Sequence, residues 1–182
     1  DVVLENSTID NLYNCAQNNK DFSILAPSIE GVNYKNKYYV KKNIFPNVHS
    51  MNFVTGCALF FNMYALDVIG KFDEKIFLYY EENDLYLRSL KKDFKIYLVE
   101  NSQIKHIGNA STDLIDKKDI EVSRNWHLMW STFYFHLKHY GLIVAYYKTF
   151  FKLLSASFKY FVYSILGKST LKKIYFARIS GI

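Results

Sequence analysis

Helical and extended patterns of hydrophobic residues follow one another along this chain. The first predicts a helix that Ser7 caps and that runs to about Asn19, with an apolar face of Ile9, Leu12, Tyr13 and Ala16. Residues 21–27 predict a short buried strand that proline ends, and residues 31–50 an irregular or hairpin excursion, or else a solvated loop. Such alternation is typical of an α/β fold.

The middle of the chain continues the alternation. Residues 53–61 predict a strand that contains Gly56, and residues 63–69 a short helix that Gly70 ends. A second helix is expected over residues 80–91 and a strand over 95–99. A glycine inside a strand marks a bulge or a close approach by ligand or backbone, and both interpretations stay open for Gly56.

The C-terminal third is helical and apolar. A long helix is expected from Asp116 to Tyr140, where Gly141 ends it. Residues 142–166 follow, and their only charges are Lys148, Lys152 and Lys159. At 100° per residue these lysines fall within about 40° of one another. We therefore expect two regions, an α/β part over residues 1–115 and a helical tail over residues 116–182.

Charge is divided unevenly between these regions. The chain carries +6, yet the last 61 residues hold nine Lys or Arg and no Asp or Glu, which leaves about −3 for the first 121 residues. The partner of the tail should be anionic. Nucleic-acid-binding surfaces carry their cations on a polar face, whereas these lysines lie among long apolar runs, so we expect no nucleic-acid partner.

An anionic membrane surface suits the tail better. Three lysines oppose a membrane-spanning helix, because each costs about 2.5 to 3.5 kcal/mol near the bilayer centre. A helix that lies on the leaflet accepts lysines on one stripe and aromatics opposite. The alternative is a packing helix, against another part of the protein or against a second copy in a homo-oligomer.

Three carboxylates crowd into the apolar stretch Phe77-Leu-Tyr-Tyr-Glu-Glu-Asn-Asp-Leu-Tyr-Leu-Arg88. Mutual repulsion and partial desolvation raise the pKa of at least one carboxyl group in such a cluster. A carboxylate with a raised pKa can act as a general base that takes a proton from a hydroxyl. The three candidates are Glu81, Glu82 and Asp84. The alternative is a helix start, where the macrodipole favours acids.

Other blocks flank this cluster in a fixed order. They are Thr55-Gly-Cys-Ala-Leu-Phe-Phe61, Ile69-Gly-Lys-Phe-Asp-Glu74 and, downstream, His106-Ile-Gly-Asn-Ala-Ser111. Together the four blocks resemble the C-terminal part of the catalytic domain of family-two glycosyltransferases, inverting enzymes of the GT-A fold that include rhamnosyltransferase-like proteins. The resemblance covers residues 1–111 and implies a Rossmann-like half, binding the nucleotide, upstream of Asp1.

The resemblance also implies roles for single residues. Glu82 occupies the position of the catalytic base, where the family has Asp, with Asp84 and Glu81 as substitutes. Gly56 and Asp73 are expected near substrate, although Asp73 has an alternative role as a turn cap.

A metal is implied as well. Asp1 resembles the last carboxylate of the family's D-x-D element, and His106 is the expected second ligand of Mn²⁺ or Mg²⁺, with a structural histidine as the alternative. The expected function is transfer of a sugar, with inversion, from a nucleotide-diphosphate donor to a glycan or lipid-linked acceptor in cell-surface polysaccharide synthesis. The expected place is the cytoplasmic face of the membrane, peripherally bound. The alternative is a non-catalytic, membrane-associated interaction module of the same descent.

Overall fold

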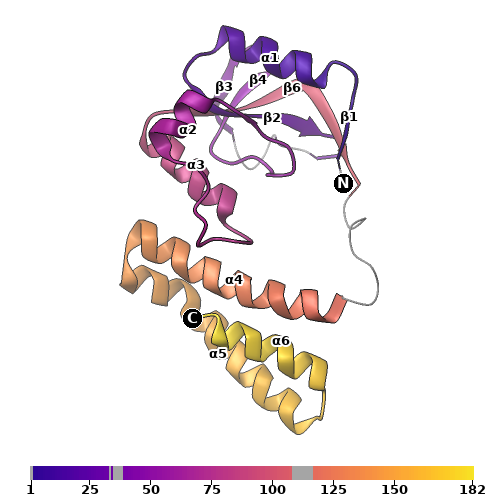
Figure 1. Ribbon diagram of the computed structural model, residues 1–182, viewed down its shortest axis with the longest axis vertical. Coiled ribbons are helices and arrows are strands. Elements are labelled where there is room, and N and C mark those ends of the chain that lie inside the picture. The colour runs from indigo at the N-terminus through magenta and orange to yellow at the C-terminus, as the bar shows by residue number, and fades with distance from the viewer. Residues whose placement is uncertain (1, 33, 35–38, 108–116) are drawn as a thin grey trace. The chain divides into compact units, whose positions relative to one another are not determined.

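The computed structural model describes residues 2–32, 34, 39–107 and 117–182. The chain divides into two compact units. Residues 1–71 and 82–111 form the first, here called the sheet unit, and residues 72–81 and 112–182 form the second, here called the helical unit. The sheet unit mixes strands and helices (Figure 1), so the predicted α/β class is confirmed.

The sheet unit is built on one sheet in the order β3-β4-β6-β2-β5, with β1 paired to β6. The two longest strands, β2 and β6, pair in parallel, and the other pairs are antiparallel. The strand bounds are β1 Val2–Leu4, β2 Phe22–Ile29, β3 Tyr39–Phe45, β4 Val48–Met51, β5 Phe60–Phe61 and β6 Lys95–His106.

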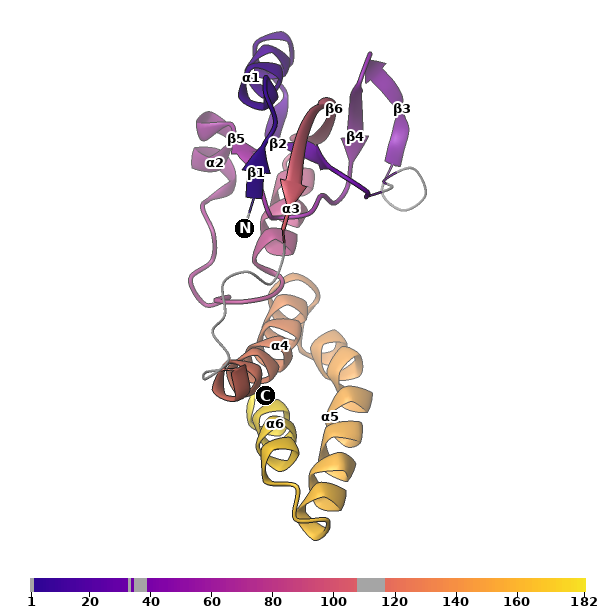
Figure 2. The ribbon, with the colours of Figure 1, turned by 90° about the vertical axis from the view of Figure 1, so that its right-hand side faces the viewer.

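Helices cover both faces of this sheet (Figures 1 and 2). Helix α1 (Thr8–Asn18) packs on one face, where Leu12 meets Leu25 and other buried residues. Helices α2 (Met63–Ile69) and α3 (Glu81–Lys91) pack on the other, where Leu66 and Leu85 join Ile24 of β2. Neighbouring residues of β2 thus serve opposite layers, as the two-residue period of a strand requires.

Helix α1 lies within a residue of its predicted bounds, but its buried face differs. Thr8, Leu12 and Cys15 are buried, whereas Ile9 and Tyr13 are more than half exposed. Ser7 occupies the cap position in a left-handed conformation and makes no capping hydrogen bond. The Thr8 hydroxyl instead lies within hydrogen-bond distance of the backbone carbonyl oxygens of Glu5 and Gln103. This buried contact fixes which side of α1 faces the sheet.

The limits of three predicted strands were wrong. Pro27 lies inside β2, where the pairing with β6 shifts register between Pro27 and Ser28 and so accommodates the missing N–H. Only Phe60 and Phe61 of the predicted strand over residues 53–61 are extended and paired, so Gly56 lies in the loop before it. Strand β6 is longer than expected and reaches His106.

The helical unit contains α4 (Lys117–Tyr140), α5 (Leu142–Ile165) and α6 (Ser169–Ser180), of which the last was not predicted. Gly141, with φ of 87°, separates α4 from α5 as expected, and Gly167, with φ of 66°, lies in the next turn. A Cβ on Gly181 would lie 2.7 Å from the Trp126 carbonyl oxygen, so the end of α6 docks on α4 only because residue 181 has no side chain.

Residues 72–81 belong to the helical unit because they are hydrogen-bonded to α4. The Trp130 indole donates to the carbonyl of Lys75 at 2.8 Å, and the Ser131 hydroxyl donates to that of Leu78 at 2.7 Å. Trp126, Trp130 and Tyr134 stack in sequence along the same helix. None of the helices in the described ranges is long and apolar enough to cross a bilayer.

Candidate functional site

Glu82 and Gly56, which lie 26 positions apart in the sequence, meet in the sheet unit. A Cβ built on Gly56 would lie 3.2 Å from both Cδ and Oε1 of Glu82. Gly56 is therefore explained by a close approach, as one of the two sequence interpretations had it, but the group that approaches is the Glu82 side chain. Both residues are partly open to solvent, so a ligand can reach this carboxylate.

The backbone at this point is unusual. Glu82 lies in the first turn of α3, where the helix dipole stabilises a negative charge. Tyr79 and Tyr80, which lead into that turn, both have positive φ, 65° and 68°. Bulky residues in this region cost about 1 to 3 kcal/mol each and cluster at functional sites. Tyr80 is held there by its contact with Phe135 of α4, whose ring centroid is 4.9 Å away.

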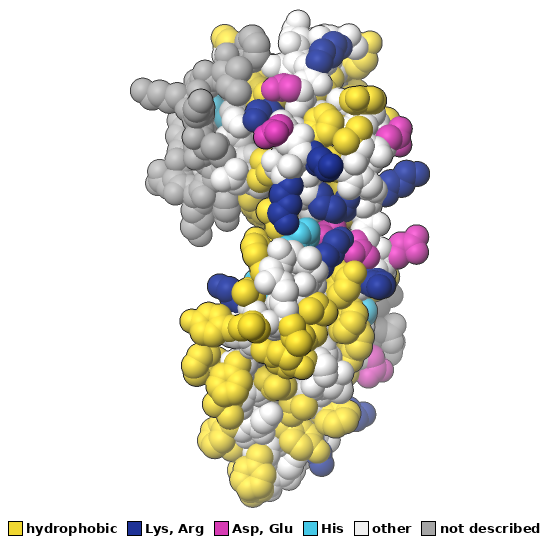
Figure 3. Space-filling view, turned by 90° about the vertical axis from the view of Figure 1, so that its left-hand side faces the viewer, with side chains coloured by type: hydrophobic (Ala, Val, Ile, Leu, Met, Phe, Trp, Pro, Cys, Tyr) yellow, Lys and Arg dark blue, Asp and Glu magenta, His cyan; other side chains and the backbone are white. Residues whose placement is uncertain are grey.

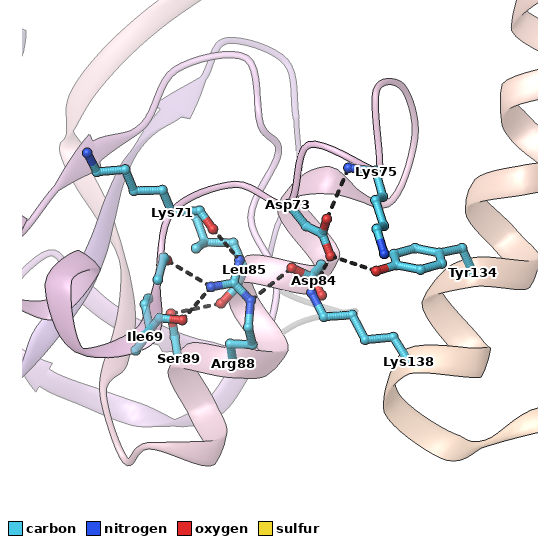
Figure 4. A network of polar contacts seen from close by, with 11 residues as sticks. Ile69, Lys71, Asp73, Lys75, Asp84, Leu85, Arg88, Ser89, Tyr134 and Lys138 are labelled. Atoms are coloured by element: carbon cyan, nitrogen blue, oxygen red, sulfur yellow. Dashed lines mark hydrogen bonds and ion pairs between the residues drawn. The ribbon is translucent and has the colours of Figure 1, made fainter.

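Asp84 has a different environment. Its side chain is fully buried, and the Arg88 Nε donates to its Oδ2 at 2.8 Å (Figure 4). A buried carboxylate paired with a guanidinium one helical turn away is a structural arrangement, since loss of either partner leaves an uncompensated charge. Asp84 is thus shielded from any ligand that reaches Glu82.

Arg88 extends this pairing to the end of α2. Its Nη1 donates to the carbonyls of Ile69 and Gly70, and its Nη2 to that of Lys71 at 2.7 Å. These carbonyls follow the last turn of α2 and lack intrahelical partners, so a cation at this helix C-terminus satisfies them and suits the dipole. The Asp84–Arg88 pair therefore fixes α2 against α3.

The three acids do not act as one cluster. At 100° per residue, Glu82 and Asp84 project about 160° apart around α3. Glu81, the first residue of the helix, is half-buried, with its Oε2 shielded from solvent. Glu81 and Glu82 are both intermediate in burial and both lie in the first turn, but only Glu82 has the close approach of Gly56, so it is the candidate that the geometry favours.

Asp73, predicted near substrate or as a turn cap, caps its turn and binds α4. Its Oδ1 accepts from the Lys75 N–H at 3.0 Å, and its Oδ2 accepts from Lys138 Nζ at 2.7 Å and from the Tyr134 hydroxyl at 3.1 Å (Figure 4). Burial raises the pKa of Asp73, but these hydrogen bonds and the Lys138 charge outweigh burial, so the net pKa lies below its usual value.

His106 lies at the end of β6 and is exposed, so it is not a core residue. It is the antiparallel partner of Val2, which places it beside the start of the described chain. The predicted second ligand, Asp1, lies outside the described residues. Within residues 2–32, 34, 39–107 and 117–182 no group of three or more His, Cys, Asp or Glu side chains could hold a metal. The described residues supply one donor, His106, and do not by themselves form the predicted Mn²⁺ or Mg²⁺ site.

The sequence interpretation missed a groove of about 550 Å³ in the sheet unit, whose lining mixes amides with apolar residues such as Pro46, Val48 and Val99. Amides line it from one face of α1, at Asn11, Asn14 and Asn18, and from β6, at Asn101. The spacing of three, then four residues along α1 was a signal that could have revealed it. Amides both donate and accept hydrogen bonds, so this groove suits a ligand rich in hydroxyl groups.

We expect Asp84→Ala to lower the free energy of unfolding by about 3 to 5 kcal/mol, because it leaves the Arg88 guanidinium without its buried partner. Urea denaturation followed by circular dichroism measures this change. Glu82→Gln is the matched control on the same helix and should stay within about 0.5 kcal/mol of wild type. Equal stability of the Asp84→Ala variant and wild type would contradict the structural role.

The lowered pKa of Asp73 gives a pH dependence. A depressed carboxyl pKa adds stability above the unfolded value, about 3.9, and that stability is lost as the pH falls below it through the folded pKa. The stability of wild type should therefore fall as Asp73 becomes protonated, whereas the Asp73→Asn variant should lack this contribution to stability at every pH. Thermal melts of both proteins over this range provide the test, and parallel pH profiles for the two would refute the assignment.

Comparison of this chain with protein-family models, with curated proteins and with solved structures found no match. The family resemblance of the four sequence blocks therefore stays a hypothesis. The Glu82–Gly56 contact, the strained turn before α3 and the amide-lined groove are the structural features on which a function can be proposed.

Proposed function

We propose that this chain belongs to an inverting glycosyltransferase of the GT-A type. It would help to move a sugar from a nucleotide-diphosphate donor to a hydroxyl of a glycan or a lipid-linked acceptor. The order of the four sequence blocks supports the family. The parallel pair β2 and β6, with antiparallel β5 at the edge, is compatible with an α/β transferase core.

The observation that carries the proposal is the placement of Glu82. It is a partly accessible acid in the first turn of α3, at the base position of the motif, and a glycine gives its carboxylate room. The left-handed pair Tyr79 and Tyr80 fixes where the helix begins and thus where this carboxylate points. A positioned carboxylate of this kind is what a general base requires.

The proposed reaction is a single displacement. Glu82 accepts the proton of the acceptor hydroxyl as its oxygen attacks the anomeric carbon of the donor sugar. The new bond joins that oxygen to the anomeric carbon, and the bond from this carbon to the diphosphate oxygen breaks. The nucleotide diphosphate leaves with the electron pair. Attack from the side opposite the leaving group inverts the anomeric centre.

The amide-lined groove lies on the α1 face of the sheet, whereas α3, which carries Glu82, packs on the other face. Two of its side chains are partly engaged, since the Asn18 amide donates to the backbone carbonyl of Asn14 and the Asn11 amide to that of Asn101. The remaining donor and acceptor capacity of the amides matches the hydroxyls of a glycan. The groove is separate from the Glu82 site, and the proposed reaction does not depend on it.

A non-catalytic interaction module of the same descent is the second candidate. It is favoured by Glu82, which is one methylene longer than the family Asp and shifts the carboxylate by about one C–C bond, roughly 1.5 Å. A misplacement of that order can cost about 100-fold in rate. The burial of Asp84 against Arg88 strengthens this alternative, because it leaves one fewer acid to replace Glu82 as base.

Glu82→Gln in the complete enzyme should lower turnover by about 100-fold or more, with donor affinity nearly unchanged, because only the proton acceptor is lost. Transfer of labelled sugar from a panel of nucleotide-diphosphate sugars to membrane glycolipid measures the rate, and calorimetry measures donor binding. Undiminished turnover in this variant, or no transfer by wild type with any donor, would favour the interaction module.

Gly56→Ala should also lower turnover, but by less. The added Cβ, 3.2 Å from Cδ and Oε1 of Glu82, displaces that carboxylate by a few tenths of an ångström. Such a shift is smaller than the 1 Å error that costs about 100-fold. If G56A were fully active, the contact would have no bearing on catalysis.

A further inference from the structure

Helix α5 exposes an unusually large apolar face. Ile143, Phe151, Phe158 and Ile165 are each exposed by 68% or more, and further large apolar side chains on the same helix are more than half exposed. These further residues are Leu142, Tyr146, Tyr147, Phe150, Leu154 and Phe161. Hydrophobic side chains accordingly cover much of the helical unit's visible surface (Figure 3). A contiguous apolar patch of this kind marks an interaction site.

This face is directed away from the packing of the unit. The buried residues of α5 are Ala145, Thr149 and Ala156, and they face the neighbouring helices. At 100° per residue, Leu154 and Phe158 project roughly 180° from this buried side. The helical unit is thus held together by small residues, while the large ones of α5 remain uncovered in the part of the chain that the structure describes.

The lysines of α5 do not lie on its apolar face. Lys148, Lys152 and Lys159 are solvent-exposed and form a separate stripe along the helix. The Lys159 ammonium lies over the ring of Tyr175 of α6, 5.3 Å from its centroid. Partial burial lowers the pKa of Lys152, and the nearby charges of Arg178 and Lys148 lower it further.

We propose that the outer face of α5 inserts into the interfacial region of an anionic lipid bilayer. Aromatic and aliphatic side chains of this kind partition into the boundary between headgroups and acyl chains. The charge of residues 122–182, which include α5, selects the partner, since they hold nine Lys or Arg and no acid. A second copy of the chain would bring the same positive charge to the interface and be repelled, whereas anionic headgroups attract it.

The apolar face and the lysines of α5 should contribute unequally to the affinity for the membrane. The α5 lysines lie across the helix from its apolar face, and a helix with side chains is about 10 to 12 Å wide. That width is close to the Debye length, about 8 Å at physiological ionic strength, so screening reduces both their attraction to anionic headgroups and their repulsion of a second copy without removing either. Burial of the apolar face therefore supplies most of the affinity and the cations only a preference for anionic lipid. This inference rests on the helical unit alone and is independent of the proposed transferase activity.

Sedimentation of the whole chain with vesicles of phosphatidylglycerol and phosphatidylcholine in equal parts tests the proposal. The triple variant F151S/L154S/F158S should bind about 100-fold more weakly than wild type, because it removes three large side chains from the inserted face. The matched control, I9S/Y13S/Y64S, changes three apolar residues of the sheet unit that are 54%, 55% and 72% exposed, and should bind like wild type. The charge variant K148Q/K152Q should lose only a few-fold.

The remaining outcomes overturn the proposal. Wild type that stays in the supernatant with these vesicles at low salt would exclude a lipid surface. Equal losses in the α5 variant and the control would show that apolar exposure in general, and not this face, drives sedimentation. A concentration-dependent dimer in light scattering that the α5 variant abolishes, without vesicle binding by wild type, would assign the face to a second copy. Circular dichroism of each variant checks that the helices remain folded.

Discussion

The buried pair of Asp84 and Arg88 is the interaction on which the arrangement of the sheet unit's functional face depends. The pair links residues one turn apart on α3, and the Arg88 guanidinium also donates to the three carbonyls of residues 69–71 at the end of α2. A short helix such as α2, with seven residues, has little stability of its own, so the guanidinium that satisfies its last carbonyls holds it in place. Since α3 also carries Glu82 in its first turn, the same pair determines where that carboxylate can lie.

This arrangement divides the carboxylates of the motif between two tasks. Asp84 faces the interior and compensates Arg88, while Glu82 projects about 160° away, against Gly56 and toward solvent. Asp73 serves a third purpose in the helical unit, where it anchors its own turn to Tyr134 and Lys138. Acids that look equivalent in the sequence thus separate by burial and partner, and under the proposed function Glu82 accepts the proton.

The sequence predicted the parts of the fold that local signals control. Gly70 and Gly141 end helices where expected, and α3, α4 and α5 begin and end within one residue of their predicted bounds over the described residues. Features that depend on distant neighbours were not predictable in this way. The buried face of α1 follows from the Thr8 contact with Gln103, and Lys159 of α5 lies over the ring of Tyr175 of α6. A helical wheel gives the angle between side chains but does not say which side meets another element. The proximity of Gly56 to Glu82, across 26 positions, likewise has no local signature.

The central claim is that Glu82, and not Asp84, faces the reacting hydroxyl. A crystal structure of the complete enzyme with an unreactive donor analogue and an acceptor tests it most directly. The account predicts a Glu82 carboxylate oxygen within hydrogen-bond reach of the acceptor hydroxyl, about 2.6 to 3.2 Å, with Asp84 still paired to Arg88. An acceptor hydroxyl bound instead by Asp84, after its release from Arg88, or by no acid of α3, would contradict it.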